Sequence, residues 1–259
     1  MTRVLLTGAS GRLGTSLRHR FAAAGRAFLA TDIAPAADGA AVALADLADP
    51  DAVARLFAPD ISAVVHFGGL STEARWDDIL QANIIGTYNI FECARRAGVR
   101  RIIHASSYHV HGMYPMADTP IGLGADLRPD SLYAVSKIFG EGLSRLYHAK
   151  FGIDCLAIRI CSAGTPGTSR EARIWCNHDD LGRLVERALD MPDLGHCTVF
   201  GISANEDALC VNTPDAGLGW VPQHGSAEVT PLAGAPLDPD DPRNRHLGGI
   251  FATWGHPDD

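Results

Sequence analysis

Several features of membrane, secreted and nucleic-acid-binding proteins are missing from this sequence of 259 residues. No apolar run approaches the roughly 20 residues that a helix needs to cross a bilayer. No basic block interrupts a chain whose formal net charge is −8, which argues against nucleic-acid and anionic-membrane partners. The six cysteines show no C-x-x-C spacing, so we expect reduced thiols. The chain starts with a strand-like run at residues 3–7 rather than a signal peptide, which predicts a cytoplasmic protein.

Short apolar runs alternate with longer amphipathic stretches along most of the chain. Most of the apolar runs are continuous, which is typical of strands in a parallel sheet that is covered on both faces. We expect strands at residues 4–7, 27–31, 41–45, 63–67, 101–105, 155–160 and 198–201. We expect helices at residues 11–24, 50–57, 77–98, 133–151 and 179–190. The repetition of strand, helix and strand predicts an α/β fold, a Rossmann-type doubly wound parallel sheet.

Three glycines lie between the first predicted strand and the first predicted helix, in the pattern Gly8-x-x-Gly11-x-x-Gly14. Glycines let a backbone approach a pyrophosphate, and a helix N-terminus supplies free N–H groups and a positive dipole end. The same glycines would also suit a tight turn with close packing of helix on strand. Because the motif follows a strand and opens a helix, it favours a dinucleotide. The expected cofactor contacts in this loop are Gly8, Ser10, Gly11, Arg12, Leu13 and Gly14.

Asp32 ends the second predicted strand, about twenty residues past the glycine-rich loop. A carboxylate there would hold the adenine ribose hydroxyls and repel a 2′-phosphate, which favours NAD over NADP. The alternative is that Asp32 only begins a turn before Pro35. We expect Asp46 and Leu47, after the third strand, to lie at the adenine, although this pair also suits the approach to a helix.

Tyr133 and Lys137 stand four residues apart, so they share one face of a predicted helix. The pKa of a free tyrosine is about 10, and a nearby ammonium lowers it by favouring the phenolate. Tyr133 is therefore a candidate general base near neutral pH. Ser107 follows the strand at residues 101–105, at the sheet edge where sites form in open α/β folds. The alternative is a surface contact between Tyr133 and Lys137 on an amphipathic helix.

Other candidate residues have simpler interpretations. His109 and His111, with His104, suggest a metal site, but no carboxylate or cysteine partner is evident nearby, and we expect no metal. Cys161 lacks a dedicated base and is typical of a core thiol. We expect His178 to cap or orient the helix at residues 179–190, with a substrate contact as the alternative.

Together these motifs resemble those of the extended short-chain dehydrogenase/reductases, which belong with the NAD-dependent epimerases and dehydratases. The resemblance rests on Gly8-x-x-Gly11-x-x-Gly14, Asp32, His66-Phe-Gly-Gly69, Asn83, Ser107 and Tyr133-x-x-x-Lys137. Within that group the chain is similar to the uronate dehydrogenases, on the runs Gly68-Gly-Leu-Ser71, Gln81-Ala-Asn-Ile-Ile-Gly86, Ser106-Ser-Tyr-His109, Trp175-Cys-Asn-His-Asp-Asp180 and Gly201-Ile-Ser-Ala-Asn205. The resemblance spans most of the chain and fades after residue 216.

The resemblance implies that NAD oxidises C1 of a cyclic uronic acid, which gives an aldarolactone. Ser107 and Tyr133 would hold the reacting oxygen, and Lys137 would hold the nicotinamide ribose. The further cofactor contacts that it implies are Phe67, Gly68, Gly69 and Asn83. The sugar contacts that it implies are Ser71, Ser107, Tyr108, His109, Tyr133, Ser162 and Arg170. Tyr108 stands where the family carries a substrate-contacting asparagine, so the choice between glucuronate and galacturonate stays open.

Arg170 carries the expected specificity for an acid. A uronic acid has a carboxylate remote from C1, and the planar fork of an arginine can meet both of its oxygens. Arg170 follows the sixth predicted strand, at the carboxyl edge of the sheet. Arg173 is the competing candidate, and either arginine could instead be a solvated surface charge.

The end of the chain leaves its role open. Residues 217–259 are rich in proline, glycine and aspartate and lack a clear period. They could form a partly ordered tail, a cover for the substrate or an oligomer contact. We expect a single domain over residues 1–259, with substrate-binding elements mainly in residues 161–180 and 202–259, and a homo-oligomer.

Two other functions use the same residues. Sugar epimerases and dehydratases share the tyrosine, lysine and NAD, but they usually carry a larger C-terminal lobe for a nucleotide-sugar. Little follows residue 201 here, which favours a small substrate. A non-catalytic NAD-binding regulator is the third interpretation, and the presence of Tyr133, Lys137 and Ser107 counts against it.

Overall fold

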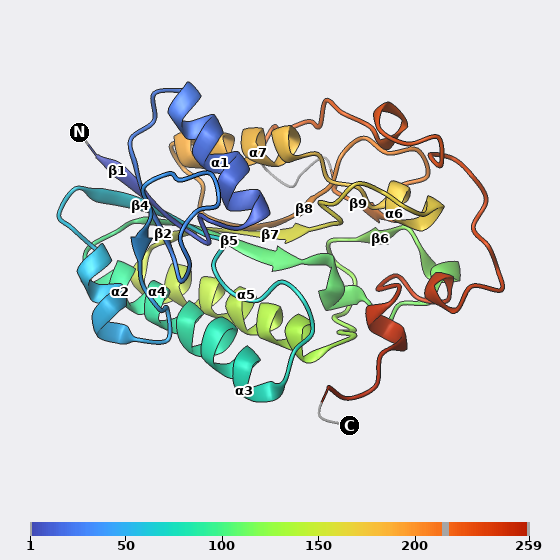
Figure 1. The fold of residues 1–259 in the computed structure, drawn as a ribbon, viewed down its shortest axis with the longest axis horizontal. Helices are drawn as coiled ribbons and strands as arrows, with labels where there is room; N and C mark the ends of the chain where they lie inside the picture. The colour runs from blue at the N-terminus through green and yellow to red at the C-terminus, as the bar shows by residue number, and fades with distance from the viewer. Residues whose placement is uncertain (1, 214–217, 258–259) are drawn as a thin grey trace.

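The structure is a computed structural model that describes residues 2–213 and 218–257. At its centre lies a seven-stranded parallel sheet with the strand order β3-β2-β1-β4-β5-β7-β8 (Figure 1). The strands are β1 (Arg3–Thr7), β2 (Phe28–Asp32), β3 (Ala43–Leu44), β4 (Ile61–His66), β5 (Arg101–Ser107), β7 (Asp154–Ile160) and β8 (His196–Gly201). This confirms the predicted Rossmann-type fold and its seven strands. The order reverses between β1 and β4, and ligands of such sheets bind beyond the carboxyl ends of the strands at this point.

Helices cover both faces of the sheet. They are α1 (Arg12–Ala23), α2 (Pro50–Leu56), α4 (Gly86–Arg96), α5 (Leu132–Phe151) and α7 (His178–Asp190). Figure 1 shows α1 and α7 on one face and α2, α4 and α5 on the other. Successive strand residues point to opposite faces, so Leu5 and Leu6 of β1 belong to two different buried clusters. Both clusters need apolar residues, which explains why the strands are continuous apolar runs.

The long helix predicted at residues 77–98 is continuous but not uniform. It consists of α3 (Trp76–Ile79), a π-helical stretch η1 (Leu80–Ile85) and then α4. The wider turn of η1 lies where the helix passes the end of β4, and it contains Asn83. Such π-helical insertions occur frequently at functional sites.

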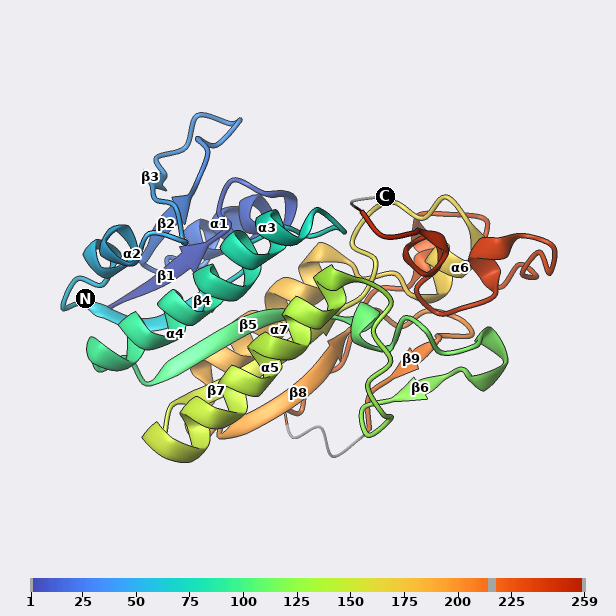
Figure 2. The same ribbon diagram turned by 90° about the horizontal axis from the view of Figure 1, so that it is seen from below.

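Several short elements were not predicted from the sequence. The helix α6 (Ser169–Arg173) follows β7, and the strands β6 (Ile121–Gly122) and β9 (Cys210–Val211) form a second, two-stranded parallel sheet. Each is too short to show a period of its own. Figures 1 and 2 place these elements beyond the carboxyl ends of β5, β7 and β8.

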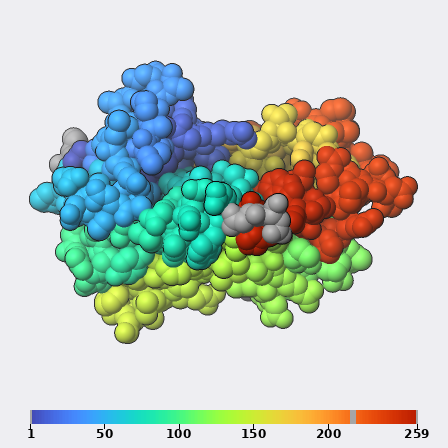
Figure 3. All heavy atoms as spheres, turned by 60° about the horizontal axis from the view of Figure 1, so that its bottom comes forward, coloured from blue at the N-terminus to red at the C-terminus, as the bar shows by residue number. Residues whose placement is uncertain are grey.

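The C-terminal tail, here residues 218–257, packs at this same end of the molecule (Figure 2). Of the C-terminal segment at residues 217–259, residues 217, 258 and 259 lie outside the described residues. The tail contains short 3-10 turns rather than long helices, and it is held by backbone hydrogen bonds. Leu247 N donates to Tyr114 O at 2.9 Å, and Gly248 N donates to Gly112 O at 2.8 Å. In the space-filling view the tail (red) forms the surface at the end opposite β1 and α1 (blue) (Figure 3).

Two further expectations can be compared with the structure. No helix in the described part of the chain is both long and apolar enough to cross a membrane. All six cysteines carry free thiols, as the absence of paired spacings predicted.

Candidate active site

A cavity of about 920 Å³ lies beyond the carboxyl ends of the strands. Residues from the ends of β2, β5 and β7 line it, including Asp32, Ser107 and Ile160. The cavity reaches from the glycine-rich loop after β1 to Phe251 in the tail. Every residue predicted to contact the cofactor or the substrate lines this cavity, with the exception of Asn83.

The glycine-rich loop forms one end of the cavity. A Cβ on Gly14 would overlap the carbonyl oxygen of Gly8, so only glycine lets α1 start this close to the loop. In the described residues no side chain caps the N-terminus of α1, whose N-cap residue is Gly11. The free N–H groups of the first turn of α1 thus lie at a cavity wall that is also lined by Gly8, Gly11 and Gly14. This end fits the pyrophosphate of a dinucleotide.

Asp32 connects the glycine-rich loop with the end of β2. Its Oδ2 accepts a hydrogen bond from Ser10 N at 2.9 Å, and its Oδ1 accepts one from Ile33 N at 2.7 Å. Asp32 therefore begins a turn, which was the simpler interpretation, and it also lines the cavity. Asp46 likewise both accepts a hydrogen bond within a turn, from Ala48 N to its Oδ1 at 2.9 Å, and lines the cavity.

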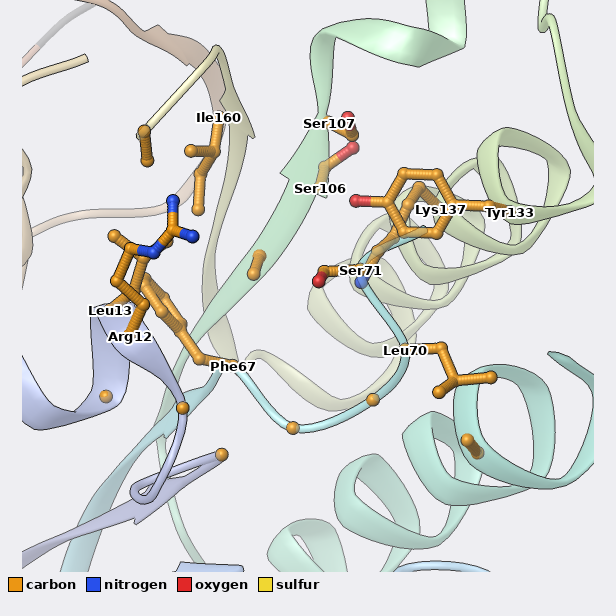
Figure 4. A pocket seen from close by; sticks show the side chains of 18 of the residues that line it. Arg12, Leu13, Phe67, Leu70, Ser71, Ser106, Ser107, Tyr133, Lys137 and Ile160 are labelled. Atoms are coloured by element: carbon orange, nitrogen blue, oxygen red, sulfur yellow. The ribbon is translucent and has the colours of Figure 1, made fainter. Parts of the chain in front are cut away.

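Ser107, Tyr133 and Lys137 come together near the middle of the cavity (Figure 4). Ser107 ends β5, and the other two residues lie in the first turns of α5. Figure 4 shows the Tyr133 hydroxyl pointing toward the two serines at the end of β5. The Lys137 Nζ lies 5.4 Å from the centroid of the Tyr133 ring. The three predicted catalytic residues are thus neighbours.

Burial controls the ionisation of this group. It raises the pKa of Tyr133 to about 12, while a hydrogen bond with Ser107 acts in the opposite direction. Burial also lowers the pKa of Lys137 to about 8, because a buried ammonium loses its hydration. The expectation that Lys137 brings the pKa of Tyr133 toward neutrality is therefore not met without a cofactor. The desolvation of the phenolate outweighs the hydrogen bond with Ser107, and the charge of Asp130 raises the pKa of Tyr133 further.

The start of α5 is held by carboxylate and hydroxyl groups. Ser131 caps the helix by accepting a hydrogen bond from Ala134 N at 3.1 Å. Glu73 accepts hydrogen bonds from Leu132 N at 3.1 Å and Tyr133 N at 2.8 Å. Glu73 was not predicted from the sequence, because nothing in its local pattern points to a helix almost sixty residues away. These bonds fix the backbone from which Tyr133 extends into the cavity.

Asn83 supports the site from behind rather than lining the cavity. Its Oδ1 accepts from Leu70 N at 2.8 Å, and its Nδ2 donates to Leu70 O at 3.1 Å. Its Nδ2 also donates to Ser136 Oγ at 2.9 Å, and that hydroxyl donates to Tyr133 O at 2.6 Å. Asn83 is only 2% exposed, and it joins the cavity loop at Leu70 to α5. The structure thus gives it these contacts with the chain, and its direct contact with the cofactor stays a prediction.

Arg170 lies at the far end of the cavity from the glycine-rich loop, in α6. It is only 6% exposed, and its Nη1 donates to Leu247 O at 3.0 Å. No carboxylate in the described residues lies within ion-pair distance of it. Arg173 does not line the cavity, and its Nη2 lies 3.5 Å from Asp207 Oδ2. Of the two competing arginines, Arg170 is the one that a ligand in the cavity can reach.

His109 faces the same end of the cavity. Its Nδ1 lies 2.7 Å from Asp130 Oδ2, a carboxylate whose side chain is fully buried. Its ring stacks on Phe251 with a centroid distance of 4.0 Å, and Phe251 also lines the cavity. Sequence reasoning missed both partners. Asp130 lies in a loop, and Phe251 lies in a tail without periodicity, so only the fold brings them to His109.

The neighbouring histidines do not form a metal site. His111 Nδ1 bonds to Asp126 O at 3.0 Å, and its Nε2 bonds to Arg159 Nη1 at 2.8 Å. Burial lowers the pKa of His104 well below its usual value, so this side chain is neutral. Within the described residues no three His, Cys, Asp or Glu side chains are grouped as metal ligands.

Cys161 and His178 have structural roles. Burial raises the pKa of the Cys161 thiol well above its usual range, so it stays protonated although it lines the cavity. Asn177, rather than His178, caps α7 by accepting from Asp179 N. His178 is the first residue of this helix, and its Nε2 lies 2.8 Å from Ala163 O, so it holds the loop after β7.

Known proteins are similar to this chain in fold and in sequence. The NAD dependent epimerase/dehydratase family matches residues 4–177. The chain belongs to this family. A uronate dehydrogenase from Pseudomonas syringae pv. tomato is 41% identical over 98% of this chain and 94% of its own length. A solved glucuronic acid dehydrogenase from Chromohalobacter salexigens is 43% identical with a TM-score of 0.89, covering 100% of this chain and 99% of its own. A mutant uronate dehydrogenase from Agrobacterium tumefaciens, solved in complex with NAD, is 38% identical with a TM-score of 0.88 and 98% coverage of both chains.

The cofactor of this family agrees with the residues that line the cavity. The chain is an NAD-dependent dehydrogenase, and NAD is its cofactor. The residues that fit NAD are the glycine-rich loop with the uncapped start of α1 at the pyrophosphate and Asp32 at the adenine ribose. Ser107, Tyr133 and Lys137 line the same cavity as these residues.

Proposed function

We propose that this NAD-dependent dehydrogenase oxidises a uronic acid at C1 and releases the aldarolactone. The observation that carries the proposal is Arg170, a buried guanidinium that lines the cavity with no carboxylate of the described residues within ion-pair distance. A buried charge is costly unless it is paired. A substrate carboxylate supplies that pair with two parallel hydrogen bonds. The similarity to uronate dehydrogenases supports the same substrate class.

The reaction removes a hydride from C1 and a proton from the C1 hydroxyl, and the new C1–O double bond makes the lactone. Tyr133 takes the proton as the phenolate, and Ser107 donates a hydrogen bond to the reacting oxygen. Lys137 holds the nicotinamide ribose. NAD⁺ bound here would accept the hydride, and its positive charge would favour the phenolate form of Tyr133. Burial raises the pKa of Tyr133 to about 12, so this added charge would bring the base closer to ionisation.

The sugar lies between Ser107 and Arg170 in the proposed complex. Ser71, His109 and Ser162 line this part of the cavity and contact the ring hydroxyls, and Tyr108 lines it beside them. Phe251 covers the site from the tail, so part of residues 202–259 serves as a substrate cover. The site occupies the carboxyl edge of one domain that spans residues 1–259. We further propose that the enzyme works in the cytoplasm, where its six free thiols stay reduced.

The test measures the rate of NADH formation, by absorbance, for wild type and for Arg170→Ala. The substrates are glucuronate, galacturonate and the matching neutral sugars glucose and galactose. Wild type should use the acids far more efficiently than the neutral sugars. Arg170→Ala should lose about 2–5 kcal/mol of transition-state binding with the acids and little with the neutral sugars. Arg173→Ala is the matched control, because this arginine lies outside the cavity lining. Equal use of acids and neutral sugars by wild type would refute the uronate assignment and leave the dehydrogenase class intact.

A further inference from the structure

The guanidinium of Arg170 contacts two parts of the chain that are far apart in sequence. Tyr108, which follows β5, forms a side-chain hydrogen bond with it. Leu247, in the tail, accepts a hydrogen bond from Nη1 at 3.0 Å. Gly249 is so close that a Cβ on it would overlap the guanidinium, and its φ of +64° is in the left-handed region. Arg170 is thus confined on several sides before any substrate binds.

Tyr108 is itself fixed in place. It is 6% exposed, it lines the cavity, and its ring lies 4.2 Å from that of His109 between centroids. The hydroxyl of Tyr108 forms the hydrogen bond with the guanidinium of Arg170. Burial raises the pKa of Tyr108, so this hydroxyl stays neutral at all working pH values.

An arginine on a flexible stem loses entropy when it pairs with a carboxylate, and a fixed arginine loses less. We propose that Tyr108 and the turn at residues 247–249 are positioning elements that hold Arg170 in its binding orientation and thereby set the selectivity for acids over neutral sugars. The inference rests on the proposed uronate oxidation. It assigns the selectivity to contacts behind Arg170 as well as to the arginine itself.

The first test is Tyr108→Phe, which removes only the hydroxyl. We expect KM for the better uronate to rise about ten-fold, the usual effect of losing one hydrogen bond to a charged group. The turnover number kcat should fall less than KM rises, and KM for the matching neutral sugar should change little. Tyr114→Phe is the matched control, because Tyr114 is a buried neighbour that does not line the cavity. It should leave both KM values as in wild type.

The second test separates contact with Arg170 from backbone strain. Gly249→Ala adds a methyl group against the guanidinium, whereas Gly195→Ala adds one at a similar φ of +62° with no atom within 4 Å. Both variants should lose stability to the left-handed φ, measured as Tm, with a larger loss in Gly249→Ala because of the overlap, and both should bind NAD as wild type does. Only Gly249→Ala should show a raised KM for the uronate.

The outcomes separate this inference from the proposed function. A wild type that uses neutral sugars as well as uronates refutes the proposed function itself. If wild type prefers acids but Tyr108→Phe and Gly249→Ala keep a uronate KM within two-fold of it, the uronate assignment stands and the positioning role is wrong. A rise in KM that is equal for acids and neutral sugars also contradicts the positioning role, because it shows general damage to the site.

Discussion

Asp32 is the last residue of β2, and its carboxylate already accepts three backbone hydrogen bonds while it lines the cavity. A 2′-phosphate would meet this charge, whereas a free ribose hydroxyl can donate to it. We expect kcat/KM with NAD to exceed that with NADP by roughly 100-fold, about 3 kcal/mol. Initial rates with varied NAD or NADP at one substrate concentration give the two kcat/KM values. Asp32→Asn should lower the ratio of kcat/KM with NAD to kcat/KM with NADP. Equal kcat/KM values in wild type would contradict the role of Asp32.

The hydroxyl of Ser107 affects the ionisation of Tyr133 as well as the binding of the substrate. Its hydrogen bond lowers the pKa of Tyr133, which burial raises to about 12. A general base must be deprotonated, so the rate falls as the pH drops through its pKa in the complex. Ser107→Ala should raise that pKa and therefore shift the acidic limb of the kcat profile to higher pH.

The pH profile of Ser106→Ala serves as the control for this prediction. The hydroxyl of Ser106 donates to Glu141 Oε1 at 2.6 Å instead of reaching the tyrosine. This variant should keep the acidic limb of wild type. An unshifted limb in Ser107→Ala would show that the serine does not influence the base.

At the scale of elements, sequence reasoning succeeded where an element carries its own signal. The strands of the main sheet are continuous apolar runs, because both faces of the sheet are covered. The helices between them are long amphipathic stretches. The elements that were missed have no such signal. The strands β6 and β9 have two residues each, and their pairing joins segments that are almost ninety residues apart. The stretch η1 has the composition of an ordinary helix, and only its neighbours explain its wider turn.

The stretch η1 gives a testable link between an element and the site. Asn83 holds both backbone groups of Leu70, and it is buried. Asn83→Ala leaves these groups unpaired, so the free energy of unfolding should fall by about 1–3 kcal/mol. Because the loop at Leu70 lines the cavity, KM for NAD should rise as well. Thermal unfolding and NAD titration measure the two effects.

Asn212→Ala is the matched control for this substitution. Asn212 bonds Phe200 in the same way, with Oδ1 accepting from Phe200 N at 2.7 Å and Nδ2 donating to Phe200 O at 2.9 Å. It does not line the cavity, and neither does Phe200. This variant should lose stability without a change in KM for NAD. A normal KM in Asn83→Ala would mean that η1 supports the fold but not the cofactor site.

At the scale of the whole molecule, the residues of the candidate site that could be predicted are those in motifs near the ends of strands. Residues such as Asp32 and Tyr133 stand at fixed distances from elements that the sequence reveals. Glu73, Asp130 and Phe251 reach the site only through long-range packing, so no local pattern marks them. Of the three roles considered for the tail, the contact of Phe251 with His109 supports the substrate cover. The homo-oligomer stays a prediction.

The central claim is that hydride leaves C1 of a uronic acid for NAD. The most direct measurement supplies glucuronate or galacturonate deuterated at C1 together with NAD and follows both products by NMR. We predict that deuterium appears on the nicotinamide ring in the same amount as the aldarolactone formed. An epimerised or dehydrated sugar without net NADH, or NAD bound without any turnover, would contradict the account.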